Sequence, residues 1–227
     1  MEKIDRRHNY VMVLDTETAN TTDQPFVYNL GWAIVDKHGN VYRTKSYVNR
    51  DVFCYERELM KSAYYAEKIP LYLEGLKTGD YIMEDWWKIL ADLRKDLRDY
   101  NVKQVCAHNA RFDLNALNTT QRWITKSKRR YVIPYGVEIW DTMKMGQDIF
   151  WKMPTFRKFC EDNGHFTKTG RMRSTAEVFY QFISGNHDFI ESHTALDDVM
   201  IEKEILAYCF RQHKKMRKGL FEKALTA

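Results

Sequence analysis

The sequence has 227 residues, of which 44% are hydrophobic and 14% aromatic. This composition excludes a disordered chain, and the length suits one domain with a full core. The apolar run at residues 10–14 is too short for a signal peptide or a membrane span. The four cysteines lie far apart without paired spacing, which disfavours structural zinc and a disulfide framework. We therefore expect a reduced, soluble, cytoplasmic protein without a membrane partner.

Basic residues outnumber acidic ones by only 36 to 31, but they are locally concentrated. The clusters lie at residues 126–130, 168–173 and 211–218. Such clusters can neutralise phosphates, although many are simply solvated surfaces, so charge alone leaves a nucleic-acid partner open. We expect one domain over residues 1–210, followed by a basic tail over residues 211–227 that continues the last helix and frays.

The chain begins with three expected strands. An apolar strand over residues 10–15 ends in an acid. Residues 30–36 and 41–48 flank the turn residues 37–40, a pattern typical of a hairpin. The opening is therefore predicted to be a three-stranded antiparallel meander.

The rest of the chain alternates between helices and strands. Apolar spacings of four and three predict a helix over residues 85–100 with one buried face. Short strands are expected over residues 103–107 and 137–140, and Asp141 suits the N-cap of the helix after the second. Further helices are expected over residues 113–125, 154–163, 175–183 and 194–212. This order predicts an α/β fold with a mixed sheet, meander plus parallel strands, flanked by helices.

Two acids, Asp15 and Glu17, follow the first strand two residues apart. With a strand period of two, both side chains point to the same side. Two like charges that close are costly unless a cation neutralises them, and hard oxygen ligands suit magnesium or manganese. The alternative for this segment alone is a solvated acidic loop.

A second strand end leads through His108 and Asn109 to Asp113, which begins a predicted helix. Taken alone, this aspartate could simply favour the helix dipole, and the other two residues could make hydrogen bonds within the loop.

The third acidic segment is Ser192-His193-Thr194-Ala195-Leu196-Asp197-Asp198. Thr194 and Asp197 have the spacing of a capping box, which places His193 just before the helix and Asp198 in its first turn. Asp197 then has a structural task, so Asp198 is the acid left for chemistry.

Together, three motifs resemble the DnaQ-like 3′–5′ exonucleases of the DEDDh type, in the ribonuclease H-like superfamily. The motifs are Asp15-x-Glu17, His108-Asn109-x-x-Phe112-Asp113 and His193-x-Ala195-x-x-Asp198. They span residues 11–206, and the chain is also similar to small stand-alone members encoded by phages. It departs from the family in a longer polar segment at residues 18–25. Residues 118–135 are expected to form an insertion around the substrate.

The resemblance implies a ribonuclease H-like fold and hydrolysis of phosphodiester bonds at 3′ ends, with release of nucleoside monophosphates. Asp15, Glu17, Asp113 and Asp198 would hold two Mg²⁺ or Mn²⁺ ions, and His193 would be the general base. Main-chain groups around Thr16 and Thr18 would grip the terminal nucleotide. The other substrate-contact candidates are His108, Asn109 and Phe112.

The expected substrate is single-stranded DNA or a short oligonucleotide. The alternatives are an oligoribonuclease acting on short RNA, an endonuclease of related architecture, and a proofreading or repair partner that binds a polymerase or another replication protein. Fold-level analogy does not choose among these substrates, and the sequence leaves the oligomeric state open.

Overall fold

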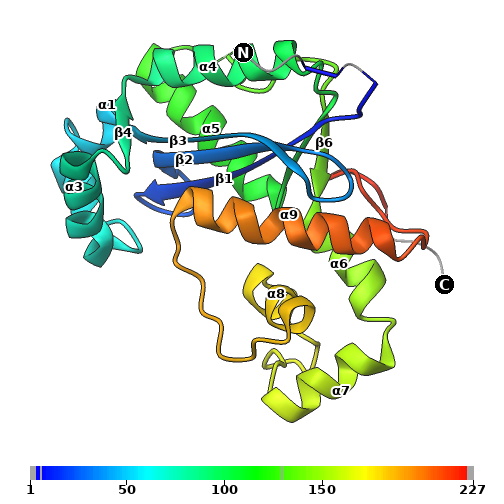
Figure 1. Ribbon diagram of the computed structural model, residues 1–227. Coiled ribbons are helices and arrows are strands. Elements are labelled where there is room, and N and C mark those ends of the chain that lie inside the picture. Colours follow the sequence, from blue (N-terminus) through cyan, green and yellow to red (C-terminus); the bar gives the residue numbers. More distant parts are fainter. Residues whose placement is uncertain (1–3, 6, 129, 224–227) are drawn as a thin grey trace.

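The computed structural model describes residues 4–5, 7–128 and 130–223 (Figure 1). Its strands form a six-stranded sheet in the order β4-β3-β2-β1-β5-β6. The strands are β1 Val11–Ala19, β2 Phe26–Val35, β3 Val41–Asn49, β4 Ile82–Glu84, β5 Gln104–Ala107 and β6 Glu138–Asp141. Strands β1 to β3 pair antiparallel, whereas β4, β5 and β6 pair parallel to their neighbours. The expected meander with added parallel strands is confirmed.

Helices cover both faces of the sheet (Figure 1). They are α1 Arg50–Phe53, α2 Arg57–Lys61, α3 Ile69–Thr78, α4 Trp86–Asp99, α5 Ala110–Thr125, α6 Thr142–Phe150, α7 Pro154–Asn163, α8 Ala176–Ser184 and α9 Ala195–Arg211, with a 3₁₀ turn η1 at Ala66–Lys68. Met12 and Leu14 of β1 pack in the core beneath α4 and α5, whereas Val11 and Val13 pack beneath α6, α8 and α9. Alternate residues of β1 therefore face opposite layers.

Strand β1 is longer than the sequence predicts, because it continues to Ala19 rather than ending at Asp15. The whole extension pairs with β2, with a register shift between Glu17 and Thr18. On its other side, β1 pairs with β5 only as far as Val13. On the side of β5 the extension therefore has no neighbouring strand. Its polar residues Asp15, Thr16 and Glu17 lie beside this open edge.

The segment between β3 and α4 contains helices α1, α2 and α3 and strand β4, none of which the sequence pattern predicts. The first two helices have four and five residues, too few to establish a helical period. They fold around a separate apolar cluster that includes Tyr28 and Tyr72. This segment carries side chains to the open end of β1.

The C-terminal segment does not continue α9, so the expected helical tail is wrong. The helix ends at Arg211, and His213 has a φ of 51°. The chain then runs beside β6, where the Leu220 N–H donates to the Ile139 carbonyl at 2.8 Å. Leu220 is only 4% exposed, which anchors the segment to the core. The last residues of the expected tail, 224–227, lie outside the described residues.

Two further expectations concern the helices. Asp141 is the N-cap of α6, as predicted, and accepts hydrogen bonds from the Met143 and Lys144 N–H groups. Trp86 is buried on α4, and Trp87 beside it is 70% exposed, as expected for a core residue and its flank. Among the residues that the model describes, no helix is both long and apolar enough to cross a membrane.

Candidate active site

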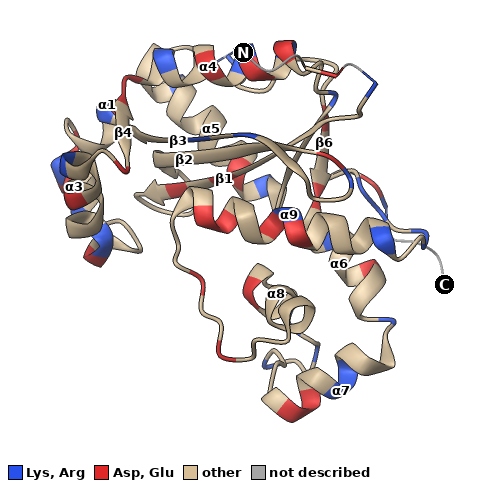
Figure 2. Ribbon diagram, in the orientation of Figure 1, with Lys and Arg blue, Asp and Glu red and all other residues tan. Residues whose placement is uncertain are grey.

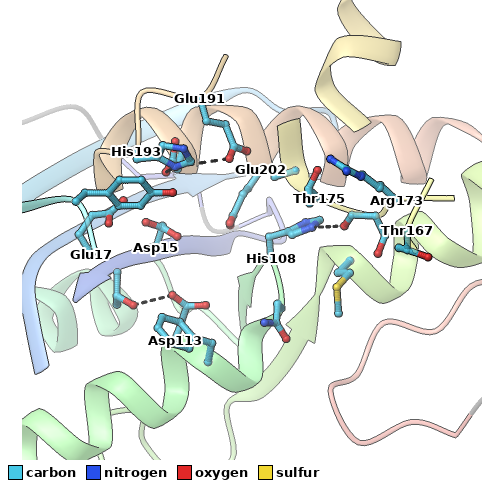
Figure 3. Close-up of a pocket in the computed structure, with 18 residues that line it drawn as sticks. Asp15, Glu17, His108, Asp113, Thr167, Arg173, Thr175, Glu191, His193 and Glu202 are labelled. Carbon is cyan, nitrogen blue, oxygen red and sulfur yellow. Dashed lines mark hydrogen bonds and ion pairs between the residues drawn. The ribbon is translucent and has the colours of Figure 1, made fainter. Parts of the chain in front are cut away.

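An open cavity of about 650 Å³ lies beside the exposed extension of β1 (Figure 3). Strand β1 supplies one wall, the start of α5 another, and α9 with the loop before it a third. A fourth wall comes from the loop between α7 and α8. The lining residues are Asp15, Thr16, Glu17, Tyr65, His108, Asn109, Phe112, Asp113, Met143, Thr167, Arg173, Ser174, Thr175, Ala176, Glu191, His193, Asp198 and Glu202.

The four acids singled out by the sequence all line this cavity. Asp15 and Glu17 project from the same side of β1, Asp113 from the first turn of α5, and Asp198 from the first turn of α9. Glu17, Asp113 and Asp198 are 7%, 3% and 8% exposed. The structure therefore brings together carboxylates from three separate segments.

The start of α9 is held against the sheet by two residues of β2. Gly31 pairs with Asp15, and a side chain there would collide with the Ala195 main chain at 2.6 Å. The Asn29 side-chain oxygen accepts the Ala195 N–H at 3.0 Å. These contacts fix the position of the first turn of α9 and therefore the position of Asp198 in the cavity.

The capping box expected at this helix start does not form. Thr194 is the N-cap residue, but its side chain caps no N–H group. Its hydroxyl instead donates to Asp197 at 2.7 Å, and the Ser192 hydroxyl donates to the same oxygen at 2.8 Å. Asn29, distant in the sequence, instead accepts the N–H of Ala195, the first residue of the helix, whereas the box would have used the N–H of Asp197. Asp197 still holds the loop, whereas Asp198 faces the cavity.

Asp113 is oriented by a neighbour on β1. The Thr16 hydroxyl donates to Asp113 Oδ1 at 2.8 Å, and both side chains are buried. Thr16 points away from Asp15 and Glu17 because of the strand alternation, toward the layer that contains α5. This contact leaves the second carboxylate oxygen of Asp113 free for another partner.

Burial and mutual repulsion oppose ionisation of these acids. Burial raises the pKa of Glu17 to about 8, with the Asp198 charge adding to the effect. Burial also raises the pKa of Asp198 to about 7, and that of Asp113 to about 7 despite the Thr16 hydrogen bond. The pKa of Asp15 is also raised, first by burial and then by the charge of Asp113. A cation bound among them would relieve both penalties.

His193 lies at the mouth of the cavity in the loop before α9, with a φ of 51°. Its Nδ1 is 3.8 Å from Glu191 Oε2 and 3.9 Å from Asp198 Oδ2. Ligand atoms of Glu17, His193 and Asp198 all lie within 4.8 Å of one another. Partial burial, and then the positive charge of Lys68, lower the pKa of His193 below its usual value. The neutral imidazole is therefore favoured at neutral pH.

The other candidates for substrate contact differ in their existing hydrogen bonds and in whether they line the cavity. His108 Nε2 donates to the Ser174 carbonyl at 2.7 Å, and its Nδ1 accepts from the Thr142 hydroxyl at 3.0 Å. Asn109 and Phe112 line the cavity. Thr18 does not line it, because it follows the register shift in β1. The described residues of the expected insertion, 118–128 and 130–135, do not line the cavity either.

Several lining residues were not expected from the sequence. Tyr65 comes from the unpredicted segment before α4, and Arg173 from the loop between α7 and α8. Glu191 precedes His193 by two residues. Of these residues, Glu202 could have been predicted from the sequence, because it follows Asp198 by four residues and therefore lies on the same face of the helix.

Comparison with known proteins identifies the fold. No protein-family model matches the sequence, and no curated protein matches it. A full-length 3′-exonuclease is similar in structure, with a TM-score of 0.58 at 10% identity, over 93% of this chain and 85% of that one. Cell-death related nuclease 4 gives a TM-score of 0.52 at 10% identity, over 93% of this chain and 67% of that one.

E. coli Exonuclease I, solved in complex with a dA16 oligonucleotide, gives a TM-score of 0.51 at 13% identity. The match covers 91% of this chain but only 44% of Exonuclease I, so the chain spans less than half of that protein. At these identities the likeness concerns the fold, which is the ribonuclease H-like mixed sheet.

Proposed function

We propose that this protein is a divalent-metal-dependent 3′–5′ exonuclease that releases nucleoside monophosphates from single-stranded DNA or short oligonucleotides. The observation that carries the proposal is the convergence of Asp15, Glu17, Asp113 and Asp198 in one cavity with His193 at its mouth. The two exonucleases and the cell-death related nuclease that share the fold support it.

The donor set fits hard divalent cations such as Mg²⁺ or Mn²⁺. Asp15 Oδ2 and Asp198 Oδ1 are buried oxygens without a hydrogen-bond partner among the described residues. Buried carboxylate oxygens in this state are strongly unfavourable unless a cation or proton joins them. Asp15, Glu17, Asp113 and Asp198 would hold two ions. Such ions neutralise the phosphate charge and promote attack by water.

His193 would take the proton of the attacking water. It is largely neutral at neutral pH because burial and Lys68 lower its pKa, as a general base requires. Glu191, on the same loop, is close enough to stabilise the imidazolium that forms. Asp198 is close enough to share that task.

The remaining residues bind and orient the 3′ end. Main-chain groups around Thr16, which lines the cavity, would hold the terminal nucleotide. Phe112 offers an aromatic face to a base, and such stacking tolerates any base sequence. Asn109 offers an amide at the same wall, and His108 would contact substrate by exchanging one of its present hydrogen bonds.

Basic residues mark the side from which the strand would approach. Thr167 and Arg173 line the cavity at the two ends of a small hairpin in the loop between α7 and α8. Lys168 and Arg171 lie on this hairpin, and both are exposed. Figure 2 shows this basic loop opposite the acids of α9. Positive charge there would neutralise phosphates upstream of the scissile bond.

The proposal is tested by a time course with end-labelled DNA and RNA of several lengths, in Mg²⁺ and in Mn²⁺. We expect stepwise shortening from the 3′ end with mononucleotide products, abolished by EDTA and by Asp113→Asn. The RNA and short-oligomer arms distinguish an oligoribonuclease. Internal fragments of an end-blocked substrate would instead indicate an endonuclease, and the absence of any cleavage would indicate a binding module.

A further inference from the structure

A further carboxylate, Glu202, lies deep in the same cavity and has no task in the proposed reaction. It is 2% exposed, and its Oε2 has no hydrogen-bond partner among the described residues. Figure 3 shows its carboxyl group directed from α9 toward Asp15. A buried, unpartnered carboxylate oxygen is costly, so its retention at this place requires a physical reason.

Nearby basic side chains do not supply that partner. Lys203, the next residue on α9, pairs with Glu204 instead. Arg173 lines the cavity, but its Nε donates to the Phe166 carbonyl at 3.3 Å. The positive charge of Lys68 favours the ionised forms of Glu17 and Asp198 and so lowers the pKa of both acids, at the mouth of the cavity.

Five side chains of the cavity fall into two groups by position. Glu17, Asp198 and His193 form one, with ligand atoms within 4.8 Å of one another. Asp15 and Glu202 form the other, because the Glu202 carboxyl group is directed toward Asp15 (Figure 3). Asp15 and Glu202 each also hold a buried oxygen without a partner.

We propose that Glu202 is an additional metal ligand, which supplies a carboxylate oxygen to the divalent cation bound on the Asp15 side of the cavity. The inference rests on the proposed function, because it assumes that cations bind among the other four acids. Glu202 lies on α9 one turn after Asp198, so a single helix would present two carboxylates to the bound cations. The hard carboxylate oxygen suits Mg²⁺ or Mn²⁺.

A second reading of the same geometry is that Glu202 stays protonated and only donates a hydrogen bond. Glu202→Gln separates the two, because glutamine keeps the size and a donor but cannot supply a carboxylate oxygen. Glu204→Gln is the matched control, since it removes an acid two residues further along the same helix and outside the cavity.

The test is Mn²⁺ binding, measured by calorimetry and by electron paramagnetic resonance of free Mn²⁺ at pH 8. For Glu202→Gln we expect the loss of one bound ion per chain or at least a tenfold weaker affinity, with Glu204→Gln unchanged. A Glu202→Gln variant that folds and binds Mn²⁺ like the unmodified chain would overturn the inference while leaving the exonuclease proposal intact. An unmodified chain that binds no Mn²⁺ would overturn both.

If Glu202→Gln does not fold, a Mn²⁺-soaked crystal of the unmodified chain decides. Anomalous scattering should place an ion with a Glu202 oxygen at a coordination distance of about 2.0–2.6 Å. Ions ligated only by the other four acids, with Glu202 turned away, would contradict the proposal.

Discussion

The ring of Tyr65 stacks on the imidazole of His193, with centroids 4.2 Å apart and an angle of 16° between the planes. Lys68 Nζ lies 5.3 Å from the centre of the same tyrosine ring. The short 3₁₀ turn before α3 therefore packs against the proposed general base and fixes one face of it. Because His193 sits in a loop, this contact helps to limit the rotation of its ring, together with the nearby carboxylates of Glu191 and Asp198.

Removing the Tyr65 ring should lower kcat without affecting metal binding. Aromatic pairs contribute about 0.5–1.5 kcal/mol, which corresponds to about a two- to tenfold loss for Tyr65→Ala. Tyr65→Phe keeps the ring and should retain activity. Single-turnover cleavage of a labelled oligonucleotide measures the effect, with Tyr55→Ala, a 68% exposed tyrosine of the same segment, as control. Equal rates for Tyr65→Ala and the unmodified chain would remove this positioning role.

His193→Ala should lose about 10²- to 10⁴-fold in turnover, the usual contribution of a general base. Because four carboxylates remain, Mn²⁺ affinity should stay within about threefold of the unmodified value. His187→Ala, on the same loop and exposed, is the matched control. Loss of Mn²⁺ binding in His193→Ala would instead make this histidine a ligand, which its place beside Glu17 and Asp198 also permits.

The adjacent acids Asp197 and Asp198 should respond oppositely to the same substitution. Asp197→Asn removes a charge from the first turn of α9 and weakens two hydroxyl contacts, costing about 0.3–1 kcal/mol of stability with little loss of activity. Asp198→Asn should abolish cleavage and retain or raise the melting temperature. Chemical denaturation and cleavage rates, measured on both variants, check the pair. Inactive but stable Asp197→Asn would show that the assignment is reversed.

The sequence predicted the central sheet and the main acids because these depend on local patterns. A buried strand with period-two acids identifies Asp15 and Glu17, and the resemblance to known motifs adds Asp113, Asp198 and His193. The mixed sheet follows from a meander followed by strand–helix alternation, although that pattern does not contain the edge strand β4. The structure contains these features as predicted because each depends on a pattern of only a few neighbouring residues.

Contacts between distant segments were not predictable in this way. The cap of α9 comes from Asn29, 166 residues before Ala195. Tyr65 reaches His193 from a segment of very short helices without a readable period. The tail joins β6 through main-chain bonds that basic composition does not encode. In each case tertiary packing, rather than local propensity, determines the outcome.

Metal-free protein should lose stability as pH rises, and added Mg²⁺ should restore it. Burial raises the folded pKa of Glu17 to about 8 and that of Asp198 to about 7, above the values of about 4 expected when unfolded. Stability from these neutral carboxyls is complete below about pH 4 and is lost as pH rises toward 8. Mg²⁺ binds the ionised carboxylates, so its effect should grow over the same range.

The measurement is the melting temperature with EDTA and with Mg²⁺, at pH 5.5 and pH 8. A hundredfold excess over Kd contributes about 2.7 kcal/mol. For a chain of this size that is about 5–10 °C at pH 8, with a smaller gain at pH 5.5. The same gain at both values would mean that the acids do not take up the ion. Asp113→Asn should remove most of the gain.

The C-terminal segment is fastened by Arg217, which makes an ion pair with Asp148 of α6 at 2.9 Å, with both side chains largely buried. These hydrogen bonds lower the pKa of Asp148, outweighing the opposing effect of burial. The contribution of this ion pair to the stability of the fold is therefore present above about pH 4 and is lost as pH falls further. Arg217→Met should cost about 1.5–3 kcal/mol and expose the segment to protease, while cleavage of oligonucleotides persists. Lys215→Met, on the exposed part of the same segment, should leave both denaturation midpoint and proteolysis unchanged.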